Sequence, residues 1–180
     1  MNESAVSSLL KKKREVKKSL CKDLKLSYKK PLLAVILDKD LLKEDKGKID
    51  FFLNGSDALD MEIVVLADFS LKGHKNGKVK FIPYNRQNRK VVLEAADTAL
   101  CFKFSDVEEM LLNGVIPVSL NRKEIKDYNP NEESGNSFIY KTWDPWHVFA
   151  ALVRAQETFK FPYDWKHIVR EGLSSVCDEK

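Results

Sequence analysis

The sequence predicts an α/β fold: a Rossmann-like three-layer α/β/α domain with a mostly parallel sheet of about six strands. Short apolar runs bounded by Pro, Gly or Asp alternate with amphipathic segments, and the run from Leu32 to Leu37 is apolar at every position. A strand that is apolar at both odd and even positions is buried on both faces, so helices must cover the sheet on both sides. Alternating strands and helices are typical of a doubly wound sheet with right-handed crossovers.

The expected elements follow this alternation along the chain. Strands are expected at 32–37, 61–66, 79–82, 98–102, 115–119 and 137–140, with a polar turn at 73–77. Helices are expected at 3–22, 48–57, 88–95, 105–112, 145–159 and 164–173. Ser105 is the expected N-cap of the fourth helix, and Asp144 followed by Pro145 is typical of a helix start. Trp146, on the presumed apolar face of its helix, is expected in the core rather than in a sugar-stacking platform.

Length and composition fit one globular domain. The chain has 180 residues, of which 43% are hydrophobic, and a formal net charge of +4. We expect residues 1–28 to form a basic N-terminal helix that leads into a single domain over 29–180. A charge this small does not require nucleic acid as a partner, and the lysine-rich stretch 11–18 is expected to be a solvated helix face.

Cysteine and histidine positions point to no metal or redox centre. Cys21, Cys101 and Cys177 lack the short spacing of a zinc or redox motif, and the three histidines lie far apart. We therefore expect no metal site, free thiols and a reducing compartment, with the cytoplasm as the expected location. The sequence has no apolar run near 18 residues, so no membrane span is expected.

Several short segments follow one another in the order of a known family. They are Lys46-Gly47, Leu59–Leu66, Ala95-Ala96-Asp97, Gly114-Val115-Ile116-Pro117-Val118, Asp127-Tyr128-Asn129-Pro130 and Ser134–Tyr140. Their collinear order resembles the C-terminal domain of glycogen and starch synthases, which are GT-B glycosyltransferases with two Rossmann-like domains. The resemblance covers about nine-tenths of the chain, and the Gly-x-Ile-Pro strand is its most specific match.

The resemblance implies a ligand and a set of site residues. In the family, this domain holds ADP-glucose or UDP-glucose and needs a positive clamp and backbone N–H groups for the diphosphate. The positions that match the family pattern or its loops are Lys46, Gly47, Glu109, Arg122 and Lys123. These are the predicted donor-binding residues, and no catalytic residue and no further cofactor are implied.

The chain also departs from the family pattern at three places. Asp40-Leu41-Leu42 stands where the family has Ser-Arg-Leu, and a Glu-Pro-Cys-Gly-Leu loop after Phe102 is missing. Leu120–Glu124 replaces a Thr-Gly-Gly-Leu turn, which removes the glycines that let a backbone approach phosphate closely. Each charged residue of the predicted site also has a simpler explanation, as a solvated charge or, for Glu109, as an acid near a helix start.

These observations leave three functions open. The first is a degenerate glycosyltransferase domain that serves as an accessory subunit and docks an acceptor-domain chain or a second copy through 146–159 and 159–163. The second is a genuine donor-binding half of a split glucosyltransferase. The third is a nucleic-acid-binding module that uses the basic N-terminal helix, which would make binding strongly salt-dependent. We expect no catalysis by the chain alone, because GT-B chemistry takes place between two domains.

Overall fold

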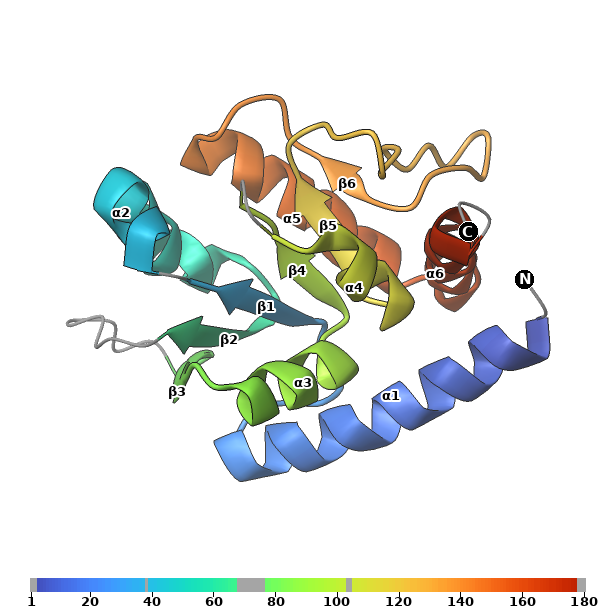
Figure 1. Cartoon of the computed structure of the whole chain (residues 1–180), viewed down its shortest axis with the longest axis horizontal. Coiled ribbons are helices and arrows are strands. Elements are labelled where there is room, and N and C mark those ends of the chain that lie inside the picture. The colour runs from blue at the N-terminus through green and yellow to red at the C-terminus, as the bar shows by residue number, and fades with distance from the viewer. Residues whose placement is uncertain (1–2, 38, 68–76, 103–104, 178–180) are drawn as a thin grey trace.

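A single parallel sheet organises the molecule (Figure 1). The computed structural model describes residues 3–37, 39–67, 77–102 and 105–177, with only the backbone described at 39–45. Six strands lie in the order β3-β2-β1-β4-β5-β6 and all neighbours are parallel. The strands are β1 (Leu32–Ile36), β2 (Glu62–Ala67), β3 (Val79–Pro83), β4 (Thr98–Leu100), β5 (Ile116–Ser119) and β6 (Phe138–Ile139). The predicted fold class is confirmed.

Helices connect the strands and cover both faces of the sheet (Figure 1). They are α1 (Glu3–Leu24), α2 (Lys39–Gly55) with a 3₁₀ turn at Ser56–Ala58, α3 (Arg86–Ala95), α4 (Val107–Leu112), α5 (Pro145–Phe159) and α6 (Pro162–Cys177). Two details of the prediction are wrong. The second helix begins at Lys39 rather than at 48, and the N-cap of α4 is Asp106, whose carboxylate accepts from the backbone N–H of Glu109 at 2.9 Å. Most of the predicted turn at 73–77 lies outside the described residues.

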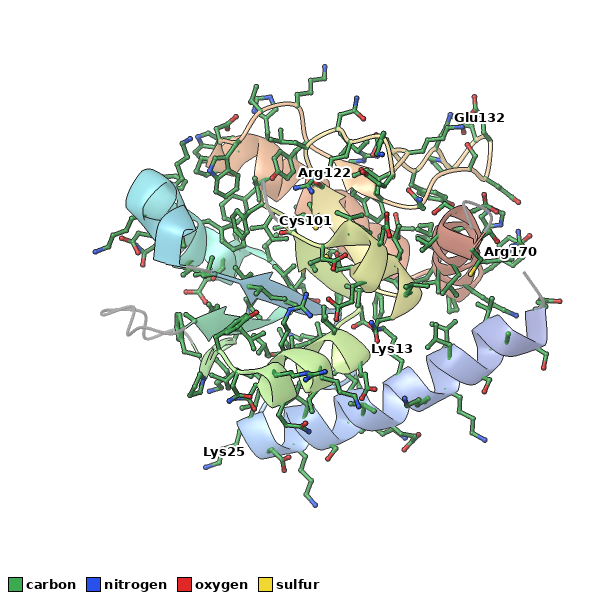
Figure 2. The ribbon with its side chains drawn as sticks, viewed as in Figure 1. Lys13, Lys25, Cys101, Arg122, Glu132 and Arg170 are labelled. Carbon is green, nitrogen blue, oxygen red and sulfur yellow. The ribbon has the colours of Figure 1, made fainter. Side chains whose placement is uncertain are left out.

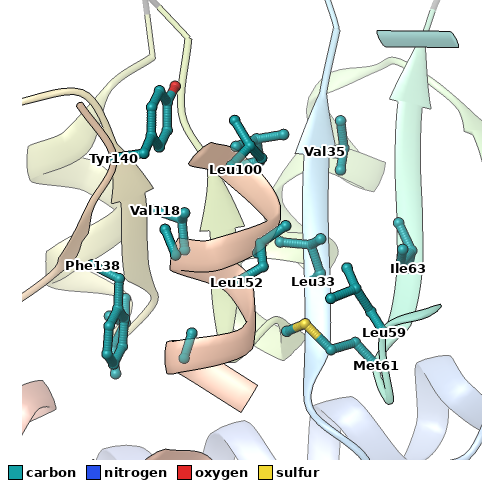
Figure 3. Packing of buried hydrophobic residues seen from close by; sticks show 14 of the residues in the cluster. Leu33, Val35, Leu59, Met61, Ile63, Leu100, Val118, Phe138, Tyr140 and Leu152 are labelled. Atoms are coloured by element: carbon teal, nitrogen blue, oxygen red, sulfur yellow. The ribbon is translucent and has the colours of Figure 1, made fainter. Parts of the chain in front are cut away.

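The strands bury both faces, as the unbroken apolar runs predict. Leu33 and Val35 of β1 face α2, α5 and α6, and they pack with Leu152 of α5 (Figure 3). Leu32 and Ala34 of the same strand face α1, α3 and α4. Because side chains alternate along a strand, each face of the sheet receives its own hydrophobic layer.

The N-terminal helix packs against other helices of the molecule. Figure 1 shows α1 crossing the molecule from α6 to α3, and it packs against both. Lys13 and Lys17 each expose only 5% of their surface, so the expected solvated lysine face is wrong at these two positions. The Lys13 ammonium donates to the carbonyls of Leu93 and Asn113, both at 3.1 Å, and thereby caps the carboxyl ends of α3 and α4.

The fifth helix turns a different face to the core from the one expected. Val148, Ala151, Leu152 and Ala155 are buried, whereas Trp146 is 73% exposed. The expectation that Trp146 packs in the core is therefore wrong. At about 100° per residue, Trp146 shares its side of the helix with positions 150 and 153, so the helix carries apolar residues on two faces.

Candidate functional site

The carboxyl edge of the sheet is where a ligand site is expected in this topology. β1 leads into α2 on one face of the sheet, and β4 leads into α4 on the other face. The order in which strands are added to the sheet therefore reverses between these two neighbouring parallel strands. Ligands of open α/β sheets bind in the crevice outside the carboxyl ends of the strands at such a switch point. The described residues that border this crevice belong to the β4–α4 loop, the loop after β5 and the segment after β6.

Arg122 ties two of these loops together. Its guanidinium, from the loop after β5, donates to the backbone carbonyl of Phe102 at the end of β4 and to that of Ser105 at 3.2 Å. Figure 2 shows Arg122 next to the end of β4, beside Cys101. The side chain therefore links Phe102 to Ser105, and two of its five N–H donors are already used within the chain.

Glu109 is turned toward the helix layer instead of the crevice. Its carboxylate accepts from Arg89 of α3, with Nη1 2.7 Å from Oε1, and the two side chains form an ion pair. The hydrogen bond to Glu109 raises the pKa of Arg89 above its ordinary value. Glu109 thus joins α4 to α3 on the outer face of the sheet.

Lys46, Gly47 and Lys123 lie on the surface. Lys46 and Gly47 lie inside α2, beyond its first turn, and a Cβ added at Gly47 would meet nothing within 4 Å. A glycine within a helix supplies no tight turn around a phosphate. Lys123 is exposed beside Arg122 in the loop after β5. Among the described residues, no hydrogen bond or ion pair joins Lys46, Glu109 and Arg122 to one another, and the donor-binding role of the five predicted residues stays a prediction.

An aromatic wall borders the same edge and was not predicted. The rings of Phe102 and Trp143 meet edge to face with centroids 5.2 Å apart, and the Tyr140 hydroxyl donates to the carbonyl of Cys101 at 2.9 Å. The Lys48 ammonium of α2 lies 5.9 Å from the centre of the Trp143 ring. The aromatic residues clustered at 140–146 in the sequence were the available signal for this wall.

The start of α5 carries a fixed carboxylate at this edge. One oxygen of Asp144 caps the helix by accepting from the backbone N–H groups of Trp146 and His147, and the other accepts from the Thr142 hydroxyl at 2.6 Å and contacts the His147 ring. The Thr142 hydrogen bond is the main cause that lowers the pKa of Asp144 to about 2, so the group stays ionised. Its contacts are those of a helix cap rather than of a proton donor.

Metal binding and membrane insertion find no support in the described part of the chain. Over 3–37, 39–67, 77–102 and 105–177, no group of three His, Cys, Asp or Glu side chains is placed to hold a metal ion. Within the same ranges, none of the helices is both long enough and apolar enough to cross a bilayer.

Several solved structures similar to this chain are glycosyltransferases. The C-terminal domain of a glycosyl transferase group 1 family protein from Francisella tularensis aligns with a TM-score of 0.56 at 12% identity, covering 84% of this chain and 88% of that one. A trehalose-6-phosphate synthase aligns with a TM-score of 0.59 at 13% identity, covering 93% of this chain and 46% of that one. Spinosyn forosaminyltransferase aligns with a TM-score of 0.55 at 18% identity, covering 81% and 40%. The chain therefore has the fold of a GT-B glycosyltransferase domain of the C-terminal, Rossmann-like type.

Within that class, curated sequences point to one kind of synthase. A glycogen synthase from Gloeobacter violaceus is 33% identical over 48 residues, and one from Fervidobacterium nodosum is 30% identical over 50 residues. These matches cover 27% and 28% of this chain and a tenth of each relative's length. No family model matches the chain. The sequence thus resembles glycogen synthases locally, in agreement with the order of its short motifs.

Proposed function

We propose that this chain is a GT-B-type glycosyltransferase domain that has lost its sugar-nucleotide site and acts as an accessory subunit that docks a partner. One observation carries the proposal. Two of the predicted donor-binding side chains are bound within the chain, Arg122 to backbone carbonyls and Glu109 to Arg89. A donor diphosphate needs cations and N–H groups that are free and aimed at it before it arrives.

The loop after β5 also supports the proposed loss of the sugar-nucleotide site. Residues 120–124 contain no glycine, and the glycines of the described chain with positive φ, Gly114 and Gly135, lie elsewhere. Gly114 ends α4 before β5 begins, at the opposite edge of the sheet, and Gly135 packs against Asp127 in the loop before β6. The lack of a positive-φ glycine in the described loops at the carboxyl edge supports the proposed loss of a backbone cradle for phosphate.

A surface suited to a protein partner lies on the outer side of α5. Trp146 is 73% exposed and Phe51 of α2 is 47% exposed, and their rings meet edge to face with centroids 5.9 Å apart. Val153 continues the apolar stripe along α5. We call Phe51, Trp146 and Val153 the α2–α5 face. Exposed aromatic clusters of this kind mark interaction surfaces.

The occupant we propose for the α2–α5 face is an acceptor-type domain carried by a separate chain. This chain spans 46% of the trehalose-6-phosphate synthase chain and 40% of the forosaminyltransferase chain. Each of these glycosyltransferases therefore carries a second part of similar length beside the part that matches this chain. Trp146 lies in the first turn of α5, at the carboxyl edge, where a second domain would meet the crevice.

A donor-binding half of a split glucosyltransferase is the second candidate. Lys46 and Lys123 favour it, because neither has an ion pair or hydrogen bond within the part of the chain that the structure describes. Two unpaired cations leave some positive charge for a diphosphate. A nucleic-acid module is disfavoured, since Lys13 and Lys17 of the basic stretch are buried in internal contacts.

An amide chemical-shift titration of the labelled protein with ADP, UDP, ADP-glucose and UDP-glucose tests the proposal. We expect no saturable shifts at Ser105–Glu109 or Leu120–Lys123 at millimolar ligand. Saturable shifts there that weaken in Lys46→Ala or Lys123→Ala would instead establish the donor-binding half. The exposed lysine variant Lys22→Ala serves as the charge-matched control, because it lies at the far end of α1.

A further inference from the structure

A second hollow lies at the amino edge of the sheet, away from the crevice described above. It measures about 470 Å³ and is lined by Arg14, Lys17, Tyr28, Lys29 and Phe159. These residues come from α1, from the loop that joins α1 to β1, and from the last turn of α5. All three charged residues of the lining are cations. An electropositive hollow attracts anions and raises their local concentration.

The cations of this hollow are not equivalent. Lys17 is buried, and its ammonium is already hydrogen-bonded within the chain, since it donates to Asp97 and to the carbonyl of Lys30, both at 2.6 Å. Arg14 and Lys29 are exposed, and neither has a hydrogen bond or ion pair in the described ranges of the chain. By contrast, Lys12 and Lys18 of the same helix pair with acids. Arg14 and Lys29 are therefore free to contact an anion.

Two aromatic rings supply an apolar wall beside these cations. Tyr28 is 41% exposed, and Phe159 is held in place by an edge-to-face contact with Trp165, with centroids 5.0 Å apart. The Lys17 ammonium lies 5.0 Å from the centre of the Phe159 ring and further anchors it. A flat ring placed against Tyr28 and Phe159 would be shielded from water while an attached anionic group faces the cations.

We propose that this hollow binds a small phosphate ester that carries a ring, such as a nucleotide or a sugar phosphate. The phosphate contacts Arg14 and Lys29, and the ring lies against Tyr28 and Phe159. A guanidinium and an ammonium that line the same hollow provide the charge-assisted hydrogen bonds that phosphate oxygens accept. The site is independent of the proposed function, because it uses none of the residues at the carboxyl edge.

The test is an amide chemical-shift titration of the full chain with AMP, ribose 5-phosphate, adenosine and inorganic phosphate. We expect saturable shifts at Arg14–Lys18, Tyr28–Lys30 and Phe159 with AMP or ribose 5-phosphate, and much weaker ones with adenosine or phosphate alone. Tighter binding of AMP than of ribose 5-phosphate would identify the ring as a base, and equal binding would identify it as the sugar. Either result supports the proposal.

Charge-matched variants distinguish binding at this hollow from nonspecific electrostatic attraction of the anion to a basic surface. The variant Arg14→Ala with Lys29→Ala should weaken AMP binding by about tenfold or more, because both phosphate contacts are lost. The control Lys11→Ala with Lys22→Ala removes the same charge from exposed positions outside the lining and should leave binding unchanged. Equal weakening in both variants, or no saturable shift at the amino edge with any phosphate ester, would overturn the proposal. Shifts confined to Ser105–Glu109 and Leu120–Lys123 would overturn it together with the proposed loss of the donor site.

Discussion

Charged side chains of the amino edge, Lys13, Lys17 and Asp97, are buried, whereas at the carboxyl edge the aromatic ring of Trp146 is exposed. At the amino edge, Lys13, Lys17 and Asp97 are each less than a tenth exposed, and each forms hydrogen bonds with other elements of the fold. At the carboxyl edge, Arg122 closes a loop and Trp146 faces solvent. Ligands of this fold class bind at the carboxyl edge. The charged network at the amino edge holds the domain together, and the exposed ring at the carboxyl edge is what the proposed docking surface requires.

The largest expected effect is at Asp97. Its carboxylate accepts from Lys17 Nζ at 2.6 Å and from the backbone N–H of Leu32 at 2.7 Å, so it joins α1, β1 and β4. Asp97→Asn leaves the Lys17 ammonium buried without its counter-charge, and we expect a loss of about 3–5 kcal/mol in the free energy of unfolding. Urea denaturation at pH 7 measures it.

A double variant tests the reason for that loss. Adding Lys17→Met to Asp97→Asn removes the uncompensated charge and should restore most of the lost stability. If Asp97→Asn costs less than about 1 kcal/mol, the buried pair does not hold the amino edge and the contrast between the two edges fails.

Arg122→Ala is the corresponding change at the carboxyl edge. Loss of the contacts to the carbonyls of Phe102 and Ser105 should lower the free energy of unfolding by about 1–3 kcal/mol and speed amide exchange in 105–109. The neighbouring variant Lys123→Ala removes the same charge from an exposed side chain and should cost under about 0.5 kcal/mol. Equal effects of the two variants would mean that Arg122 does not hold the loop and remains free for a ligand.

A smaller effect is expected from titration of Lys13. Burial is the main cause that lowers the pKa of Lys13 from 10.5 to about 8. Between these values the unfolded chain binds a proton that the folded chain does not, so the free energy of unfolding rises with pH in this window. Relative to Lys13→Met, the wild type should gain about 1 kcal/mol between pH 8 and pH 9.

The neighbouring lysine provides the control for this titration. Lys12 pairs with Glu94 at 3.2 Å and its side chain is 66% exposed, so Lys12→Met should follow the wild-type pH profile. The pH profile of Lys13→Met must be subtracted from that of the wild type, because two thiols also change the free energy of unfolding in this pH range. Burial raises the pKa of Cys21 to about 11 and that of Cys101 to about 12. Those thiols oppose the Lys13 effect as pH rises, and they do so equally in all three proteins.

The sequence predicted the sheet better than the burial of Lys13 and Lys17, for physical reasons. Apolar runs such as 32–37 have few ways to be buried, so the strands were placed within two residues of their observed bounds. Lys13 and Lys17 were expected in solvent because burial of a lysine depends on distant partners, here Leu93, Asn113 and Asp97. No local pattern in the sequence reveals such partners.

The start of α2 and the orientation of α5 show two further features that the sequence pattern did not predict correctly. Residues 39–48 carry seven charges, so the amphipathic pattern that predicted a helix was visible only after 48. In α5, apolar residues occur on two sides, and periodicity alone does not say which side meets the sheet. Both errors fall on elements that border the carboxyl edge, so the surroundings of the predicted donor-binding residues were predicted less well than the sheet, and the role of these residues stays a prediction.

The smallest expected effect is at Trp146, and it tests whether the ring at the carboxyl edge is exposed to solvent. Because the side chain is 73% exposed, Trp146→Ser should change the free energy of unfolding by less than about 0.5 kcal/mol. Phe52→Ala, at a ring that is fully buried in the adjacent helix, should cost about 3–5 kcal/mol in the same measurement. A loss above about 1 kcal/mol for Trp146→Ser would place this ring in the core and remove the α2–α5 face as a docking surface. If sedimentation shows that the wild type dimerises and Trp146→Ser does not, the face binds a second copy of the chain instead of an acceptor-type domain.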